Sequence, residues 1–381
     1  MSGSNKLAQK NRKLQNDELA RRRVPCLVAY LNPFRIVENP TLPPWNITIE
    51  DVNKKTWDYV ALHEMVGGID VGLTAPYHMT IARDGALALP PLPELRNDQQ
   101  IVEFFNRCLA ALLLGGLYCE AITLDGLDFG TIIDWKYIRV HSHGRAASNR
   151  FHEQIRMRQA STLEAIGLHS PRTVQLKALD EAMKSGRAVL EAIPEVSVEF
   201  LLKGVTGIAR RDWGTALANL WIIVEQITSG LWKHHVLANA QKDEIISGRS
   251  KQLADPRTWT IAARHELLHQ IGILPISVLG KLSAARKSRN DLVHIGKHPQ
   301  ANETLALYEA VLALLSIAAP SQSIPLAKLN LSDHSLSDPF APKKSEKIEP
   351  SHWMGIPKLP GEAELEKLEA TQLRQKRSKK L

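Results

Sequence analysis

Arg289, Asn290 and His294 are the residues of this sequence whose types and spacing best suit chemistry beside a phosphate. Arginine stays charged and binds phosphate oxygens through paired donors. Histidine has an unperturbed pKa of about 6.5, so it can take and give a proton near neutral pH. An asparagine amide can donate to a phosphate oxygen or hold the histidine ring. RNA carries its own nucleophile, the 2′-hydroxyl, so this set favours RNA cleavage without a metal ion.

The spacing of these residues raises a geometric difficulty. On a straight helix, the five-residue step from Arg289 to His294 turns the chain by about 500°, which leaves the side chains about 140° apart, and lifts it by about 7.5 Å. The two side chains then lie on different faces, and one chain alone would hold a phosphate poorly. Two copies related by a two-fold axis would place both pairs around one cleft. We therefore expect a homodimer.

Neighbouring charged residues are expected to assist this set. Glu225 lies beside an apolar helical stripe, and we expect it to pair with Arg286 or Arg289 as structural support. Lys287 and Lys297 flank the motif and are expected to contact RNA phosphates, which positions a strand without reading its sequence.

A rival motif lies upstream, where His265, Glu266 and His269 match the His-Glu-x-x-His pattern of zinc proteases. In that pattern the two histidines bind zinc from one helix face and the glutamate acts as a base. The third zinc ligand is missing, because Pro275 stands where the extended pattern needs a histidine. Glu303 is not excluded as that third ligand. We expect an amphipathic helix here, with its leucines toward the core and its histidines outside. A zinc-dependent hydrolase is kept as an alternative.

A group of histidines in the first half of the chain is a weaker candidate for metal binding. His141 and His143 are two residues apart, and His152 follows nine residues later. Arg139 and Arg145 lie beside them, so we expect a solvated basic loop that contacts RNA phosphates. No metal site and no cofactor are predicted.

The candidate residues at 289–294 lie in a region, residues 195–320, where the spacing predicts helices throughout. One helix carries apolar residues at steps of three and four, typical of a single buried face; these are Trp213, Leu217, Leu220, Val224, Ile227 and Leu231. Further helices are expected over 261–271, 276–295 and 303–318, with glycines at 272 and 296 ending the first two. Four helices joined by short loops favour a bundle.

The segment Ala285-Arg286-Lys287-Ser288-Arg289-Asn290-Asp291-Leu292-Val293-His294 resembles the catalytic motif of HEPN ribonucleases (higher eukaryotes and prokaryotes nucleotide-binding family). That motif is an arginine, a polar residue, three further residues and a histidine; the polar residue here, asparagine, is the one found in many members. Upstream, residues 221–225 followed by Leu231 and Trp232 are similar to the first long helix of the Apea-like HEPN branch. The resemblance covers about residues 195–320, and residues 1–170 resemble no family known to us.

The resemblance implies a metal-independent endoribonuclease that leaves a 2′,3′-cyclic phosphate and acts as a homodimer. His294 would be the general base or acid, Arg289 would stabilise the charge at phosphorus, and Asn290 would assist. It also implies a bacterial antiviral-defence or toxin-like effector, with RNA and an antitoxin or regulatory protein as partners. Many HEPN-like domains bind without cutting, so a non-catalytic RNA- or nucleotide-binding and dimerisation module stays the alternative.

The rest of the chain predicts a mixed domain and polar ends, so the fold class is α+β: a mixed N-terminal domain, then an all-α bundle of four to five helices, with disordered basic ends. The expected segments are a basic leader over 1–23, a mixed α and β domain over 24–170, a helical connector over 171–194 and a basic tail over 321–381 with some helix near 362–373. Inside the mixed domain we expect a strand over 24–31, a hairpin over 77–89 around Asp84-Gly85, a helix over 98–114, and strand over 118–133 with a turn at Asp125-Gly126.

Composition limits the class of protein. The net charge of +8 favours polyanionic partners, although part of it lies in the two ends. The three cysteines form no CxxC pair, which is typical of small buried side chains in a reducing compartment. We see no signal peptide and no apolar run near the roughly 20 residues that span a bilayer, and therefore expect a cytoplasmic protein without membrane contact.

Overall fold

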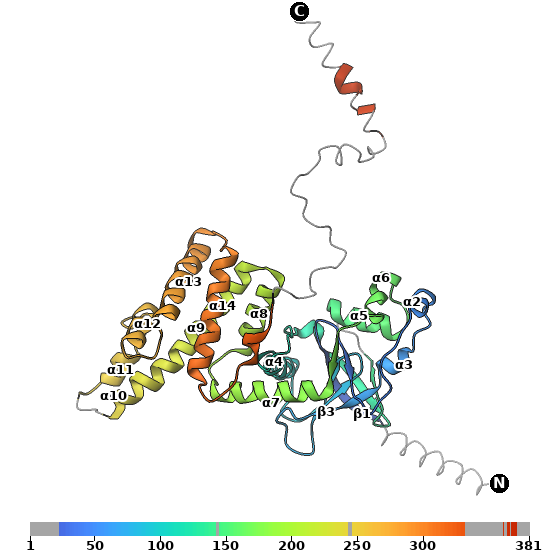
Figure 1. Ribbon diagram of the computed structural model, residues 1–381, viewed down its shortest axis with the longest axis horizontal. Coiled ribbons are helices and arrows are strands. Elements are labelled where there is room, and N and C mark those ends of the chain that lie inside the picture. Colours follow the sequence, from blue (N-terminus) through green and yellow to red (C-terminus); the bar gives the residue numbers. More distant parts are fainter. Residues whose placement is uncertain are drawn as a thin grey trace, which may run out of the picture. The chain divides into compact units, whose positions relative to one another are not determined.

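The computed structural model describes residues 23–141, 145–242, 246–331, 361, 364–365 and 367–371. The chain forms two compact units, Met1–His334 and Ser335–Leu381. The first is α+β, as predicted, and contains a curled antiparallel sheet and a group of long helices (Figure 1). In the second, residues 364–365 and 367–371 are helical, within the range where we expected some helix. The predicted leader falls outside the described residues, except for Arg23.

The main sheet has six antiparallel strands in the order β3-β4-β5-β1-β6-β7. Its strands are β1 (Arg23–Tyr30), β3 (Met65–Ile69), β4 (Met79–Ala82), β5 (Ala86–Leu89), β6 (Asp128–Ile133) and β7 (Tyr137–Val140). Strand β1 lies between β5 and β6, and its second half is fully buried. The predicted strand at 24–31 and the predicted hairpin are confirmed, with Gly85 at φ 82° in the hairpin turn.

The strand predicted over 118–133 is wrong in its first half. The turn predicted at Asp125-Gly126 is confirmed by the 3₁₀ turn Leu124–Gly126, but only β6, after that turn, is a strand. The reason is a side chain: the Asn106 amide donates to the Ile122 carbonyl at 3.0 Å and accepts from the Ile122 N–H at 2.9 Å. These bonds replace the ladder bonds that a neighbouring strand would supply.

Short helices and a second small sheet pack together in a separate core. The helices are α2 (Ile49–Lys54), α3 (Tyr59–Leu62), α5 (Ala147–Arg156) and α6 (Thr162–Ala165), and the parallel pair of strands is β2 (Ile36–Glu38) with β8 (Thr173–Gln175). Trp57 is buried in this core and its indole N–H donates to the Ile155 carbonyl at 2.9 Å. The periodicity of the sequence did not predict these short elements.

Helices α4 (Asp98–Leu114) and α7 (Leu176–Ala192) pack tightly against each other. Helix α4 has the bounds that the spacing predicts. The helix predicted within 171–194 is confirmed by α7, which also buries one face on α4. Gly186 lies so close to α4 that a Cβ there would meet the Ala111 carbonyl oxygen at 1.7 Å.

The helical part of the first unit contains the predicted long helices (Figure 1). They are α9 (Trp213–Trp232), α12 (Ile261–Gln270), α13 (Ile276–Ile295) and α14 (Ala301–Ala318). Helix α8 (Val198–Arg210) and the shorter α10 (Ala238–Lys242) and α11 (Arg249–Ala254) were not predicted individually. The stripe predicted on α9 is buried apart from Trp213, which is half-buried. A π-helical turn, Lys233–Leu237, extends α9.

Two predictions about apolar segments need correction. The tail does not begin at 321, because Pro325–Lys328 forms a 3₁₀ turn and Leu326 and Leu331 are buried. In the described part of the chain, α14 alone is long and apolar enough to cross a membrane by length and composition. It packs on α9 and α13 and buries Leu307 and Val311, and a core helix passes the same test.

The three cysteines, Cys26, Cys108 and Cys119, are free and buried, as expected. Burial raises the pKa of all three thiols, to about 12 for Cys26 and Cys108 and about 11 for Cys119. Nothing therefore activates them as nucleophiles.

Candidate active site

The motif residues occupy the last two turns of α13. The helix ends at Gly296, which adopts φ 66° as its left-handed cap, and the Gly296 N–H donates to the Leu292 carbonyl at 3.2 Å. The next helix, α14, begins five residues later at Ala301. The motif therefore lies at a helix end beside a tight connection, where carbonyl groups favour a nearby cation.

Arg289 and His294 lie on different sides of α13. Ala285 and Ser288 are buried, and Arg289 is half-buried beside them, whereas His294 is exposed. The guanidinium of Arg289 donates from Nη1 to Oδ1 of the exposed Asn290 at 3.2 Å. Arginine and asparagine are thus already adjacent, and the histidine is free of the core, as the helical geometry predicts.

The surface around the motif is basic. Between residues 286 and 297 the cations are Arg286, Lys287, Arg289 and Lys297, against the single carboxylate Asp291. Lys287 is exposed, and Lys297 lies 3.9 Å from the Asp291 carboxylate in an exposed pair. Exposed ion pairs of this kind contribute little stabilising free energy, so Lys297 can exchange Asp291 for a phosphate.

The predicted support from Glu225 takes another form. Its carboxylate accepts from the Trp221 indole N–H at 2.6 Å, one turn earlier on α9. Among the described residues it forms no ion pair with Arg286 or Arg289, so the expected pairing is not observed. Burial lowers the pKa of His265, and the charge of the half-buried Arg286 lowers it further.

The observed contacts of α12 argue against the zinc alternative. His265 is buried, not outside as expected, and its Nε2 is hydrogen-bonded to Thr228 Oγ1 at 2.9 Å. His269 uses Nδ1 to bond the Leu274 carbonyl at 2.7 Å, and Glu266 is bonded to Gln270 at 3.1 Å. No group of three or more metal-ligating side chains occurs in the part of the chain that the structure describes. The motif arises from a helix that buries one histidine as a packing residue.

The two described histidines of the group around residue 141 each contact another side chain. His152 is buried, and its Nδ1 bonds the Asp84 carboxylate at 2.8 Å. His141 is exposed and its Nε2 bonds Thr131 Oγ1 at 2.6 Å; His143 lies outside the described residues. Arg139 on β7 and Arg145 at the start of α5 are both exposed, so they remain available to an anionic partner.

The sequence did not predict the buried ion pair that His152 contacts. Arg156 of α5 donates from Nε and Nη2 to the two oxygens of Asp84, both at 2.7 Å, and all these groups are buried. Asp84 is the turn residue of the β4–β5 hairpin, where only a turn signal was visible. Its distance of 72 positions from Arg156 leaves no local pattern to find.

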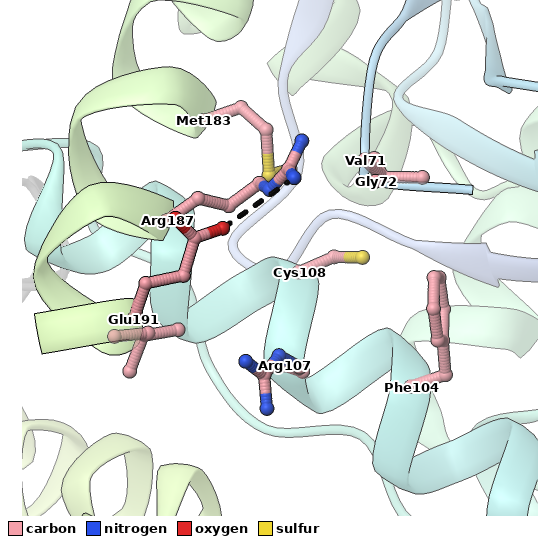
Figure 2. A pocket seen from close by; sticks show the side chains of 9 residues that line it. Val71, Gly72, Phe104, Arg107, Cys108, Met183, Arg187 and Glu191 are labelled. Carbon is pink, nitrogen blue, oxygen red and sulfur yellow. Dashed lines mark ion pairs between the residues drawn. The ribbon is translucent and has the colours of Figure 1, made fainter. Parts of the chain in front are cut away.

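Cavities occur elsewhere in the first unit. Figure 2 shows one of about 210 Å³, with Phe104, Arg107 and Cys108 projecting from α4 and Met183, Arg187 and Glu191 from α7. Arg187 lies 3.6 Å from Glu191 and 3.4 Å from Asp70, so its charge is already balanced. A larger cleft of about 620 Å³ lies between α3, the β6–β7 hairpin and α5. Neither adjoins the motif on α13.

Comparison of the chain with protein-family models, with curated proteins and with solved structures finds no match.

Proposed function

We propose that this protein is a metal-independent endoribonuclease of the HEPN type, acting as a homodimer. The observation that carries the proposal is the end of α13, where an exposed histidine follows an arginine–asparagine pair on a basic surface. Each of these side chains is accessible to a polyanion, and none is fully buried in the core. A motif kept only for packing would bury these side chains, as α12 buries His265.

The chemistry needs one proton acceptor, one proton donor and positive charge at phosphorus. His294 takes the proton of a 2′-hydroxyl, whose oxygen attacks the adjacent phosphorus while the P–O5′ bond breaks. The products are a 2′,3′-cyclic phosphate and a 5′-hydroxyl, which receives the proton that His294 took from the 2′-hydroxyl. Arg289 stabilises the added charge on the phosphate oxygens, and Asn290 donates to one of them.

The two-fold arrangement has support in the outer face of α13. Residues at alternating steps of three and four share that face: Ile276, Leu279, Ser283, Arg286, Asn290 and Val293. Ile276 is 67% exposed and Val293 58% exposed, unusual for branched apolar side chains. Packing this face on a second copy would bury them and bring the two motifs together.

The test is cleavage of mixed cellular RNA by the full chain in EDTA, comparing the native protein with His294→Ala and Arg289→Ala. We expect the native chain to cut and both variants to lose at least a hundredfold in rate, with cyclic phosphate ends on the products. His269→Ala is the matched control, since it removes an α12 histidine outside the motif, and should cut like the native chain. Cutting that EDTA abolishes, or that survives both substitutions, overturns the proposal. Binding of RNA without cutting points to a non-catalytic dimerisation module.

The cellular setting follows from the same proposal. A nuclease with no metal requirement is active wherever it meets RNA, so we propose a cytoplasmic defence or toxin-like effector restrained by a regulatory partner or antitoxin. The N-terminal sheet domain would receive that signal.

A further inference from the structure

The larger cleft in the N-terminal part of the first unit has walls of mixed chemistry. It measures about 620 Å³ and lies between α3, the β6–β7 hairpin and α5. Its lining includes Tyr59, His63, Tyr137, Arg139, His141 and Glu153. Clefts of about 300–1,000 Å³ are the usual size for small-molecule sites. Apart from Arg139, for which the sequence predicts contact with RNA phosphates, none of these residues has a role in the proposed nuclease.

Two tyrosine rings give the cleft flat apolar surfaces, and each already carries a cation. Tyr59 is 38% exposed, with the Arg158 guanidinium 4.7 Å from its ring centre. Tyr137 is half-buried, with the Lys136 ammonium 5.1 Å from its ring centre. Exposed aromatic rings beside cations are the surfaces on which nucleic acid bases stack while their phosphates are neutralised.

Arg139 lines this cleft, and Lys136 and Arg158 lie against its two tyrosine rings. Within the residues described, these three cations form no ion pair, although Arg158 donates from Nε to the Trp57 carbonyl at 2.8 Å. Arg156, which also lines the cleft, is neutralised by Asp84. Arg139 is exposed on β7, where its guanidinium can bind a phosphate through paired donors. An anionic group on a ligand therefore has partners at the rim of the cleft.

Two side chains that line the cleft, His63 and Arg156, contact the same backbone carbonyl, and the lining also contains one carboxylate. The Ile138 carbonyl accepts from Arg156 Nη1 at 3.3 Å and lies 3.2 Å from His63 Nδ1, which fixes both side chains. Glu153 of α5 adds a carboxylate to the same lining. A carboxylate disfavours a purely anionic ligand but accepts well from ring N–H and amino groups.

We propose that this cleft binds a nucleotide unit, with its base between the tyrosines and toward Glu153, and its phosphate at Arg139. A nucleotide combines a flat N–H-bearing ring with a separate anionic group, which matches the separate apolar, acidic and basic parts of the lining. The unit is either a free nucleotide or an unpaired nucleotide of an RNA strand. The proposal concerns a second site and does not rest on cleavage at α13.

The test measures binding to the full-length chain carrying His294→Ala, so that cleavage does not intervene. The probes in calorimetry are UMP, GMP, ATP, ribose 5-phosphate and a 2′-O-methyl RNA pentamer. We expect saturable binding of a nucleotide probe at one site per chain, and at least tenfold weaker binding of ribose 5-phosphate, which lacks the base. Saturation by mononucleotides identifies a free nucleotide as the ligand, and saturation by the pentamer alone identifies a strand.

Substitutions then locate the site. Tyr137→Ala and Arg139→Ala should each weaken binding about tenfold or more. Tyr77→Ala and Arg107→Ala remove an exposed tyrosine and an exposed arginine outside the cleft, and should change binding less than twofold. Circular dichroism establishes that each variant is folded. Absence of saturable binding by any nucleotide probe overturns the proposal, as do equal losses in the cleft and control variants or equal affinity for ribose 5-phosphate.

Discussion

Asp84 and Arg156 form a buried, bidentate ion pair in the sheet domain. Nε lies 2.7 Å from Oδ2 and Nη2 lies 2.7 Å from Oδ1, with 0% of the aspartate and 3% of the arginine exposed. His152 adds a third contact to the same carboxylate and stacks on Tyr30, with ring centres 3.9 Å apart. The pair fixes the β4–β5 turn to α5, which forms one wall of the larger cleft.

Removing the charge of Asp84 should destabilise the fold severely. Asp84→Asn leaves the Arg156 guanidinium buried and unneutralised, which typically costs about 3–5 kcal/mol. Urea unfolding followed by circular dichroism measures the loss. Asp180→Asn is the matched control, because it breaks the exposed Asp180–Lys184 pair and should cost less than about 1 kcal/mol. Equal losses in the two variants would contradict a special role for the buried pair.

His265 should make the helical part of the chain sensitive to acid. Burial, with a smaller effect from Arg286, lowers its pKa to about 4, against about 6.5 in an unfolded chain. A lowered pKa means that the neutral form stabilises the fold at neutral pH. That stability falls as the pH drops from about 6.5 toward 4, by about 3 kcal/mol in total.

The substitution His265→Gln keeps a polar atom near Thr228 but cannot titrate. The free energy of unfolding, measured from pH 7 to pH 4.5, should therefore fall less steeply for this variant than for the native chain. His78→Gln, at an exposed histidine, should leave the native slope unchanged. Parallel slopes for the native chain and His265→Gln would show that other groups cause the acid sensitivity.

Local sequence patterns predicted the helices and the motif, whereas contacts between residues far apart in the sequence were not predicted. The bounds of α4 and α13 follow from apolar spacing and glycine caps within the segments themselves. Arg289 and Asn290 are neighbours in the chain, so their contact needed no knowledge of the fold. The partner of Asp84 lies 72 positions away, and a turn signal says nothing about what it will face.

The errors at histidines have one physical cause. A histidine has both an apolar body and a polar edge, so the same helical spacing suits a surface ligand and a packed residue. His265 is buried because Thr228 on α9 satisfies its Nε2, and His152 because Asp84 satisfies its Nδ1. Neither Thr228 nor Asp84 lies near its histidine in the sequence, so residue spacing alone predicted that the histidines are exposed.

The contact between α4 and α7 depends on a missing side chain. A Cβ at Gly186 would meet the Ala111 carbonyl oxygen at 1.7 Å, and a backbone atom cannot move aside cheaply. Gly186→Ala should therefore cost at least about 1–3 kcal/mol. Gly280→Ala is the matched control, since that glycine lies within α13 with nothing within 4 Å of an added Cβ. It should be stabilising by roughly 0.5–1 kcal/mol, and urea midpoints compare the two. An unchanged midpoint for Gly186→Ala would mean that the helices lie further apart.

The outer face of α13 should decide the oligomeric state. Ile276→Lys and Val293→Lys place charge where the proposed dimer buries apolar surface, so sedimentation should show a shift from dimer to monomer. Leu163→Lys changes an apolar side chain that is 85% exposed on α6, and should leave the dimer intact. A native chain that stays monomeric at every concentration would remove the two-fold cleft from the proposal.

Mixing two inactive variants should restore RNA cleavage if the cleft takes arginine from one copy and histidine from the other. Arg289 and His294 lie on different sides of α13, which is the geometric reason to expect such sharing. A chain with His294→Ala keeps its arginine, and a chain with Arg289→Ala keeps its histidine, so a mixed dimer contains one complete pair. We expect the mixture to recover a substantial fraction of the native rate, up to about a quarter if half the dimers are mixed and each keeps one of its two Arg289–His294 pairs complete. Adding Val293→Lys to both chains should abolish the recovery, since the dimer is then lost. A mixture as inactive as its components, with mixed dimers verified by sedimentation, would mean that each chain supplies both residues to its own phosphate.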